Sequence, residues 1–374
     1  MGDRLMKRRI SWVLLFAVGL ASPVFAAVTL EREMYARSET AAGEEPVLTV
    51  HFIDVGGGDG ILIDTPSHKK ILIDGGWTWG DRGIVPEEYG EYLDEFLGDD
   101  VVDLIIVSHP DCDHFLGLLD VLDRYVVRQM WYTGYDSEEL STSWRNFMDK
   151  VEEEEDLLFV SPVCNYFGLG SEIRFDDSET YTCADDVVLT LINAKQWLKD
   201  EAYGSANNRK LREDQRRNSS SLVVRLDYGP TSFLFTGDTN GRDKNASDVN
   251  QCDDQELFMV LNNENQQNPL YGRLACTVLK VPHHGSNGSS SLRFLQAVHP
   301  EWAVISAGVH HGHPTAGALE RLKCPEVGLD EDHILRTDQG DNKDKATPSN
   351  IGDDCYRMIV DLAGIAKIEK WNVK

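Results

Sequence analysis

Residues 108–117, SHPDCDHFLG, decide the fold and the chemistry expected of this chain. Two histidines and two aspartates fall within six residues, directly after the apolar run LIIV at 104–107, which predicts a buried strand. A helix cap would need only one of these carboxylates and would leave both histidines without a role. Imidazole and carboxylate donors together suit zinc, manganese or iron, so the stretch predicts a metal site at a strand end.

Similar donors follow other predicted strands. Asp238 ends FLFTGD, His283 and His284 end TVLKVPHH, and the histidines at 310, 311 and 313 follow WAVISAG. Seven of the eleven histidines therefore lie in three strand-end clusters, which is not expected of histidines satisfied singly in a core. Two metal ions need about six protein ligands, one of them a bridging carboxylate. The candidate ligands are His109, Asp111, Asp113, His114, Asp238 and one of His283 and His284.

A pair of ions at this place would favour hydrolysis. It clamps the attacking and leaving oxygens and lowers the pKa of a bound water toward about 7. The sequence has no GxSxG nucleophile elbow and no GxxxxGK[ST] phosphate loop to indicate a competing mechanism. Asp54 and Asp59 frame the turn DVGGGDG, and Asp74 ends the strand KKILIDGG. We expect these three to hydrogen-bond the ligand loops rather than to bind metal.

The N-terminal residues predict export. Residues 1–26 combine a basic start, a short apolar core and a small-residue cleavage site, which is typical of a signal peptide and too short to span a bilayer. Residues 27–46 are predicted to be a linker, and residues 47–374 a single domain, since no break in composition divides them. We expect a secreted or periplasmic protein with no membrane span after signal removal and no obligate protein partner.

The net charge and the cysteine content limit which functions fit this chain. The net charge of -27 becomes -30 once residues 1–26 are removed, with 32 Lys and Arg against 62 Asp and Glu. So acidic a chain argues against binding nucleic acid non-specifically over a broad face. Six of the seven cysteines lie outside the opening stretch and could form up to three disulfides in an oxidising compartment, or could simply be buried.

Short strand-like runs alternate with helical patterns from residue 47 onward. The first three predicted strands are joined by short turns, which suggests antiparallel pairing. Later strands are fully apolar and separated by helices, which suggests central strands covered on at least one face. We therefore expect an α/β fold with two sheets and outer helices. Helices are expected near 87–96, 115–123, 138–154, 292–298 and 316–322, and a surface loop over 338–354.

Several ordered motifs resemble one known family. SHPDCDHFLG, LFTGD and KVPHHGS, in this order, resemble the metallo-β-lactamase fold superfamily and, within it, the C-terminal hydrolase domain of the competence protein ComEC. HFIDVGGGDGILIDT, NSSSLVVRLDYG and AGVHHGHPTAGALERL resemble further elements of that domain, so the resemblance covers roughly residues 48–370. It implies a four-layer αβ/βα sandwich with two divalent ions, Zn or Mn, at the strand ends. Because the family's membrane channel has no counterpart here, we expect a free-standing, secreted form.

The resemblance also implies roles for single residues. Asp238 matches the bridging carboxylate, and His284 the final ligand, which leaves His283 beside the ligands or facing substrate. His313 matches a histidine that could orient substrate or protonate a leaving group. Asn218 stands where the superfamily often has one more histidine ligand. The residues expected to take part in catalysis are thus Asp113, His283 and His313.

The expected substrate is a phosphodiester, with a nuclease acting on single-stranded DNA as the leading interpretation. A local basic stretch supports it, since a phosphate backbone is met by Arg and Lys. Its candidate substrate-binding residues are Arg209, Lys210, Arg212, Arg216, Arg217 and Asn218. The alternative is a solvated loop in which Glu213 and Asp214 compensate these charges. Other readings are a small-headgroup phosphodiesterase similar to phosphorylcholine esterase, a β-lactam or lactone hydrolase, and a non-catalytic, metal-stabilised binding module.

Overall fold

The computed structural model describes most of the predicted domain. The described residues are 47–77, 86–97, 101–154, 157–160, 172–174, 187–196, 203–204, 209–243, 245, 247–248, 252, 254–308, 311–339 and 355–371. The predicted signal peptide, the predicted linker and most of the predicted loop over 338–354 lie outside them.

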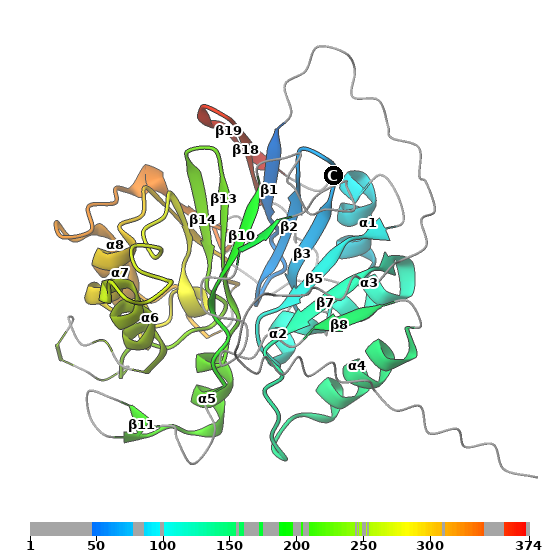
Figure 1. Cartoon of the computed structure of the whole chain (residues 1–374), viewed down its shortest axis with the longest axis horizontal. Coiled ribbons are helices and arrows are strands. Elements are labelled where there is room, and N and C mark those ends of the chain that lie inside the picture. Colours follow the sequence, from blue (N-terminus) through cyan, green and yellow to red (C-terminus); the bar gives the residue numbers. More distant parts are fainter. Residues whose placement is uncertain are drawn as a thin grey trace, which may run out of the picture.

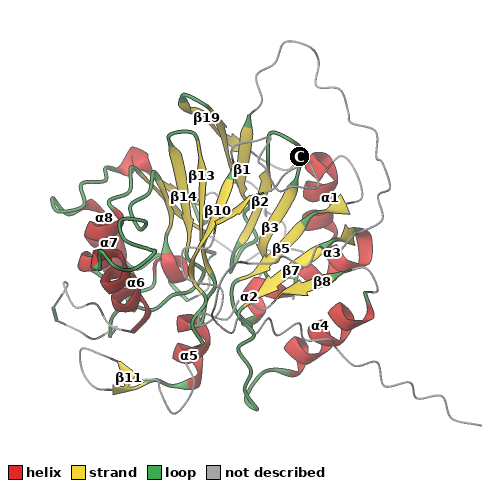
Figure 2. Cartoon of the chain, in the orientation of Figure 1, coloured by secondary structure: helices red, strands yellow, loops and turns green. Residues whose placement is uncertain are grey.

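Two sheets stack face to face, with helices on the outer face of each (Figure 1, Figure 2). The eight strands of the first sheet run in the order β19-β18-β1-β2-β3-β5-β7-β8. Their bounds are β1 (Leu48–Phe52), β2 (Gly60–Asp64), β3 (Lys70–Gly75), β5 (Leu104–Val107), β7 (Gln129–Tyr132), β8 (Leu158–Val160), β18 (Cys355–Asp361) and β19 (Gly364–Trp371).

The second sheet has seven strands in the order β17-β16-β15-β14-β13-β10-β9. Their bounds are β9 (Glu172–Arg174), β10 (Val188–Asn193), β13 (Val223–Tyr228), β14 (Thr231–Phe235), β15 (Val278–Lys280), β16 (Trp302–Ile305) and β17 (Ile334–Arg336). Two small strand pairs are β4 (Val101–Val102) with β6 (Val126–Val127), and β11 (Tyr203–Gly204) with β12 (Arg209–Lys210).

The helices divide between the two outer faces. Those associated with the first sheet are α1 (Pro86–Leu97), α2 (Cys112–Phe115), α3 (Leu118–Arg124) and α4 (Thr142–Glu153). Those of the second sheet are α6 (Asp254–Glu264), α7 (Leu292–Val298) and α8 (Ala316–Lys323), with short 3-10 turns at η2 (Pro282–Gly285) and η3 (Glu331–His333). Helix α5 (Glu213–Ser219) lies at the lower edge of the sheets in Figure 1, the edge at which α2 also lies.

Three apolar clusters account for the layers. In β5, Leu104 and Ile106 pack between the two sheets, whereas Ile105 and Val107 pack under α1 to α4. A third cluster joins the second sheet to α6, α7 and α8. A strand covered on both faces reads as a continuous apolar run, which is why LIIV shows no alternation. The expected four-layer α/β sandwich is confirmed by this arrangement.

Pairing direction decides where the loops gather. The antiparallel pairing expected for β1, β2 and β3 is confirmed, while β3, β5 and β7 pair in parallel. In the second sheet β14, β15, β16 and β17 are also parallel. Parallel neighbours bring their carboxyl ends to one edge of a sheet, and ligands bind outside that edge. The loops after β14, β15 and β16 therefore lie at one edge of the second sheet. The loop after β5 reaches the same edge, where the carbonyl of Ser108 accepts from the backbone N–H of Leu222, just before β13 (2.8 Å).

Some elements differ from expectation. The helix expected over 292–298 has these bounds, whereas the one expected over 115–123 is two helices, α2 and α3, with a break at Leu116 and Gly117. Helix α5 was not expected, because NNRKLREDQRRNSSS has no apolar periodicity; at its start the side-chain oxygen of Gln215 accepts a hydrogen bond from the backbone N–H of Arg212 (3.2 Å). No disulfide joins any two of the five cysteines in the described part of the chain.

Candidate metal centre

The loop after β5 places two imidazoles at the edge where the sheets meet. His109 follows the strand and His114 lies on the short helix α2; both are fully buried, and their ring centroids are 4.1 Å apart. Asp238 follows β14 in the opposite sheet. Gly237 before it has φ 51°, and a Cβ there would lie 2.8 Å from that of Ser108. Glycine thus lets the two ligand loops approach, one from each sheet.

The donors converge on the two oxygens of Asp238. Oδ1 lies 3.3 Å from Nε2 of His114 and 3.2 Å from Nε2 of His284. Oδ2 lies 4.0 Å from Nε2 of His109 and 3.5 Å from Nε2 of His283. One carboxylate therefore faces two pairs of imidazoles, as a bridging ligand would.

The remaining two aspartates complete each side. Oδ2 of Asp111 lies 3.7 Å from Nε2 of His109, and Oδ2 of Asp113 lies 3.7 Å from Nε2 of His284. The structure therefore brings together all the candidate ligands named from the sequence. On the first side are His109, Asp111 and Oδ2 of Asp238; on the second are Asp113, His114, His284 and Oδ1 of Asp238.

The spacing of these atoms matches ligands around a divalent cation better than it matches hydrogen bonds between the side chains. Nε2 of His109, His114 and His284 and Oδ1 of Asp238 are buried and have no hydrogen-bond partner. Separations of 3.2 to 4.0 Å are at or beyond the end of the N–H···O range. Ligands bonded to one tetrahedral ion at 2.0–2.1 Å would lie about 3.3–3.4 Å apart. Buried polar atoms without a partner are rare, so four of them gathered around Asp238 indicate a ligand there.

Outer contacts fix which ring nitrogen faces the centre. Asp74 accepts hydrogen bonds from Nδ1 of His114 (2.8 Å) and from the hydroxyl of Ser108 (2.6 Å). Because Ser108 donates to Asp74, its oxygen accepts from Nδ1 of His109 (3.0 Å). Nδ1 of His284 donates to the carbonyl of Ser306 (2.8 Å). Each imidazole thus has an acceptor at Nδ1, which directs Nε2 toward the centre, where a metal ion would bind.

The other two expected supporting aspartates differ in position. Asp59 pairs with the buried Lys280 and lies 3.4 Å from Nδ1 of His284, so it supports the second side. Asp54 accepts from the backbone N–H of Gly56 and shapes the glycine-rich turn. Lys280 was not named from the sequence, although a lysine within the apolar strand VLK already indicates a buried partner for its charge.

The field at the centre favours positive charge. Burial alone would raise the pKa of Asp238, yet His284, His283 and His114 hold it well below its usual range. Burial lowers the pKa of His284, but Asp238 and Asp59 outweigh this and raise it to about 10. In the same way Asp238 and Asp74 raise the pKa of His114 well above its usual value. Buried carboxylates that stabilise charge this strongly are suited to a divalent ion.

Two histidines lie at the rim. His283 is partly exposed, and the ring of His313 lies 5.7 Å from it and 6.4 Å from His284. Burial and the neighbouring imidazoles lower the pKa of His313 to about 4. His313 is therefore neutral at pH 7, which suits orienting substrate better than protonating a leaving group. His310, in the same predicted cluster, lies outside the described residues.

The basic stretch does not form one surface. Arg216 is buried, paired with Glu213 and bonded to the carbonyl of Leu211, so its predicted role in binding substrate is wrong: its charge is used inside the protein. Arg212 is exposed and paired with Asp214. The compensation by Glu213 and Asp214 considered as the alternative is what the structure has. Arg209 and Lys210 form β12, and their side chains are not described.

Arg217 and Asn218 do reach the centre. Nε of Arg217 donates to Oδ1 of Asp111 (2.5 Å), the oxygen turned away from His109. Nδ2 of Asn218 lies 3.5 Å from Nε2 of His283. Helix α5 therefore contributes one guanidinium and one amide to the first side, and Arg217 was recognised as basic but not as the partner of a ligand.

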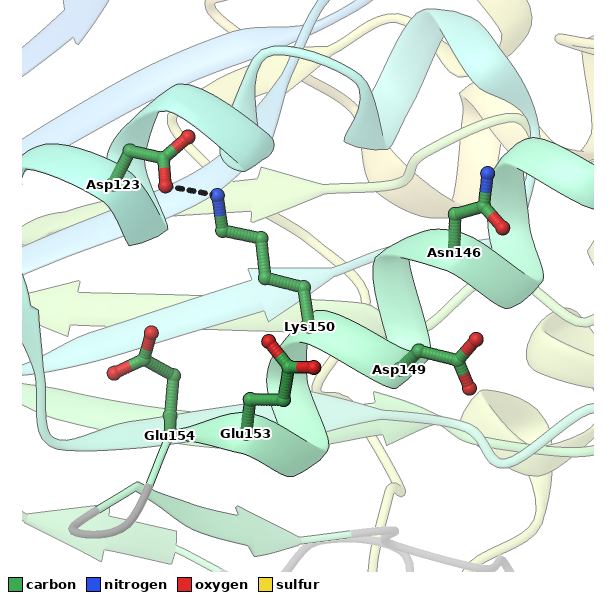
Figure 3. Close-up of a pocket in the computed structure, with 6 residues that line it drawn as sticks. All are labelled: Asp123, Asn146, Asp149, Lys150, Glu153 and Glu154. Atoms are coloured by element: carbon green, nitrogen blue, oxygen red, sulfur yellow. Dashed lines mark ion pairs between the residues drawn. The ribbon is translucent and has the colours of Figure 1, made fainter.

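A separate hollow lies on the outer surface of α3 and α4. It has a volume of about 410 Å³, shares no residue with the metal centre and contains an ion pair between Lys150 and Asp123 (Figure 3). Its lining is polar throughout: Asp123, Asn146, Asp149, Lys150, Glu153 and Glu154.

Comparisons with known proteins agree with the motifs. Residues 53–168 match the family model of the metallo-beta-lactamase superfamily. The chain is 27% identical over 310 residues to ComE operon protein 3 of Bacillus subtilis (strain 168), covering 78% of this chain and 32% of that protein. It is 33% identical over 134 residues to competence protein ComA of Neisseria gonorrhoeae, covering 34% and 16%. The chain thus spans less than a third of the length of these relatives.

Among solved structures, the chain is similar to the metallo-beta-lactamase fold protein YhfI of Bacillus subtilis, with a TM-score of 0.40, 11% identity, and coverage of 74% of this chain and 92% of that one. Similarity at this level says nothing about chemistry. The resemblance to the superfamily and to the competence proteins is confirmed by the family model and the curated relatives. Within the described residues, no helix is both long and apolar enough to span a membrane.

Proposed function

We propose that this chain is a secreted, binuclear metal-dependent phosphodiesterase, with single-stranded DNA as its leading substrate. The superfamily's hydrolase-type fold is the setting. The observation that carries the proposal is the two-sided arrangement at Asp238, whose two oxygens face separate pairs of imidazole nitrogens 3.2 to 4.0 Å away.

On the second side, Asp113, His114 and His284 would hold one ion together with Oδ1 of Asp238. On the first side, His109 and Asp111 would hold the other together with Oδ2. Two divalent ions there would supply Lewis-acid polarisation of a phosphoryl group and a nucleophile at neutral pH. Zn and Mn both suit this donor set, and its carboxylates favour Mn.

The chain's own residues would orient the substrate. Arg217, held beside Asp111, would place a guanidinium at the edge of the first side, where a phosphate oxygen can accept from it. His313, neutral at pH 7, would position the leaving group from the rim beside His283. Asp74 and Ser108 would keep Nε2 of His109 and His114 directed inward.

The first test uses mature protein stripped of metal and reloaded separately with Mn²⁺ and Zn²⁺. Each form is assayed on single-stranded DNA and on bis-p-nitrophenyl phosphate. We expect hydrolysis of both, with DNA preferred, and its loss in the Asp238→Ala and Asp113→Ala variants, each of which should remain folded by circular dichroism. Full activity in either variant would refute the centre.

A phosphodiesterase acting on small headgroups is the second candidate. It is favoured by the pairing of Arg212 with Asp214 and the burial of Arg216, which remove two cations from a DNA path, and by the charge of -30 after removal of residues 1–26. Cleavage of the small ester alone would select it. The Arg217→Ala variant should then lose activity, while the Arg212→Ala control keeps it.

A non-catalytic, metal-stabilised binding module is the candidate of another class. It predicts metal binding and a raised melting temperature with no hydrolysis of either ester. Export is tested separately, by comparing the cell fractions that contain the full chain and a variant lacking residues 1–26. Retention of the full chain inside the cell would refute secretion without bearing on the chemistry.

A further inference from the structure

The turn after β15 holds two adjacent histidines in an unfavourable backbone conformation. His283 (φ 49°, ψ 47°) and His284 (φ 53°, ψ 24°) are both left-handed, which residues with a Cβ rarely adopt. The backbone N–H of His283 donates to the carbonyl of Gly237 (3.0 Å), which ties this turn to the loop that holds Asp238. Such conformations persist where a function requires them. Here they aim both imidazoles at one carboxylate.

The protonation of His283 follows from its neighbours. Nδ2 of Asn240 donates to the carbonyl of Gln215 (3.4 Å), which orients the amide so that Oδ1 faces Nδ1 of His283 at 3.1 Å. An amide oxygen only accepts, so Nδ1 carries the proton. Nε2 of the neutral ring then has a lone pair. The amide donor of Asn218, 3.5 Å from this Nε2, agrees with that assignment.

That lone pair faces another acceptor. Nε2 of His283 lies 3.5 Å from Oδ2 of Asp238. Two acceptors do not bond to each other, and a charge-assisted hydrogen bond would be about 2.7–2.9 Å long. Across a shared cation, however, the separation is the expected one, because two bonds of about 2.0–2.1 Å span about 3.3–3.4 Å in tetrahedral geometry.

The first side also has fewer donors than the second. His109, Asp111 and Oδ2 of Asp238 make three, whereas Asp113, His114, His284 and Oδ1 of Asp238 make four. Helix α5 adds no ligand: Arg217 is a cation, and Asn218 turns its amide nitrogen to His283, where an amide N–H donates rather than ligates.

We propose that His283 is the fourth protein ligand of the first metal ion, bound through Nε2, with Asn240 fixing its tautomer and Asn218 orienting its ring. This inference rests on the binuclear centre of the proposed function. The two adjacent histidines would then bind different ions. His284 would bind the second ion beside Oδ1 of Asp238, and His283 the first ion beside Oδ2.

The test is a calorimetric and visible-absorption titration with Co²⁺ of the metal-stripped full chain. Wild type should bind two ions. His283→Ala should bind one ion with wild-type affinity and the other at least about 100-fold more weakly, because even an outer contact to a ligand is worth 10–100-fold. The control is His333→Ala, an exposed histidine paired with Asp330, which should bind both ions as wild type does.

A second variant keeps the assignment testable. Adding Asn218→His to His283→Ala returns an imidazole to the same space and should restore the second bound ion. Two ions bound to His283→Ala within threefold of wild-type affinity would overturn the ligand assignment. Wild type that binds two ions but hydrolyses no phosphodiester would refute the proposed activity and leave the assignment standing, while wild type that binds fewer than two would overturn both.

Discussion

Replacing Asp74 by asparagine should weaken metal binding without disturbing the fold. Asp74 touches no metal position directly: Oδ1 accepts from the backbone N–H of Ser108 (2.7 Å), and Oδ2 from the hydroxyl of Ser108 and from Nδ1 of His114. Its φ is 58°, a conformation that asparagine adopts as readily as aspartate. Asp74→Asn therefore keeps the shape of the side chain and the backbone conformation, and it replaces one hydrogen-bond-accepting oxygen by a donating NH₂ group.

The new amide group forces a change of tautomer. If its oxygen keeps the backbone N–H of Ser108, its NH₂ faces Nδ1 of His114, and two donors then oppose each other. His114 relieves this only by moving its proton to Nε2, the atom that lies 3.3 Å from Oδ1 of Asp238. A protonated Nε2 is no longer a ligand.

Loss of a hydrogen-bond partner behind a metal-ligating histidine typically lowers metal affinity 10–100-fold, or about 1.4–2.7 kcal/mol, and we expect the same for Asp74→Asn. The assay is the Co²⁺ titration of stripped protein, with melting curves of the same samples. Asp54→Asn is the matched control, since Asp54 is equally buried but bonds the Gly56 turn instead of a ligand histidine. Asp74→Asn that binds both ions within threefold of wild-type affinity would refute the reasoning.

Three further outcomes are expected. Gly237→Ala adds a Cβ only 2.8 Å from a neighbouring Cβ at φ 51° and should cost about 1–3 kcal/mol in urea unfolding; an unchanged midpoint would contradict it. The pKa of His284 is raised from 6.5 to about 10, so protonated His284 contributes its full stabilisation of the folded state below about pH 6.5. The melting temperature of metal-stripped protein should therefore fall from about pH 6.5 to about pH 10, and a melting temperature that is constant over this range would exclude the linkage. Arg216→Ala should cost about 3 kcal/mol and Arg212→Ala less than about 1, since only the first leaves a largely buried carboxylate, that of Glu213, without its guanidinium; equal losses in urea unfolding would disprove the difference.

The local elements that carry the donors could be predicted from the chain alone. An apolar run followed by polar donors marks a covered strand and its end, and such a pattern depends only on neighbours in sequence. The strand LIIV with its SHPDCDH end, and the helix at 292–298, are of this kind. Helix α5 was missed because a polar contact in its first turn, from the backbone N–H of Arg212 to the side chain of Gln215, rather than an apolar face, marks where it begins.

Adjacent residues with the same chemistry were separated only by tertiary structure. Arg216 and Arg217 are equivalent in sequence, but successive helical residues point about 100° apart. The first is therefore buried against Glu213 and the second reaches Asp111. His283 and His284 differ in the same way, since a left-handed turn directs them to different oxygens of Asp238.

The sequence by itself determined which residue types stand at which strand ends, because strand formation and donor chemistry are local properties. Which donors face one another was decided by the stacking of the two sheets, which brings the β5 loop against the β14 and β15 loops. Those contacts join residues more than a hundred positions apart, and no spacing along the chain encodes a distance between them. The division of Asp238 between two sets of imidazoles is therefore a property of the folded molecule alone.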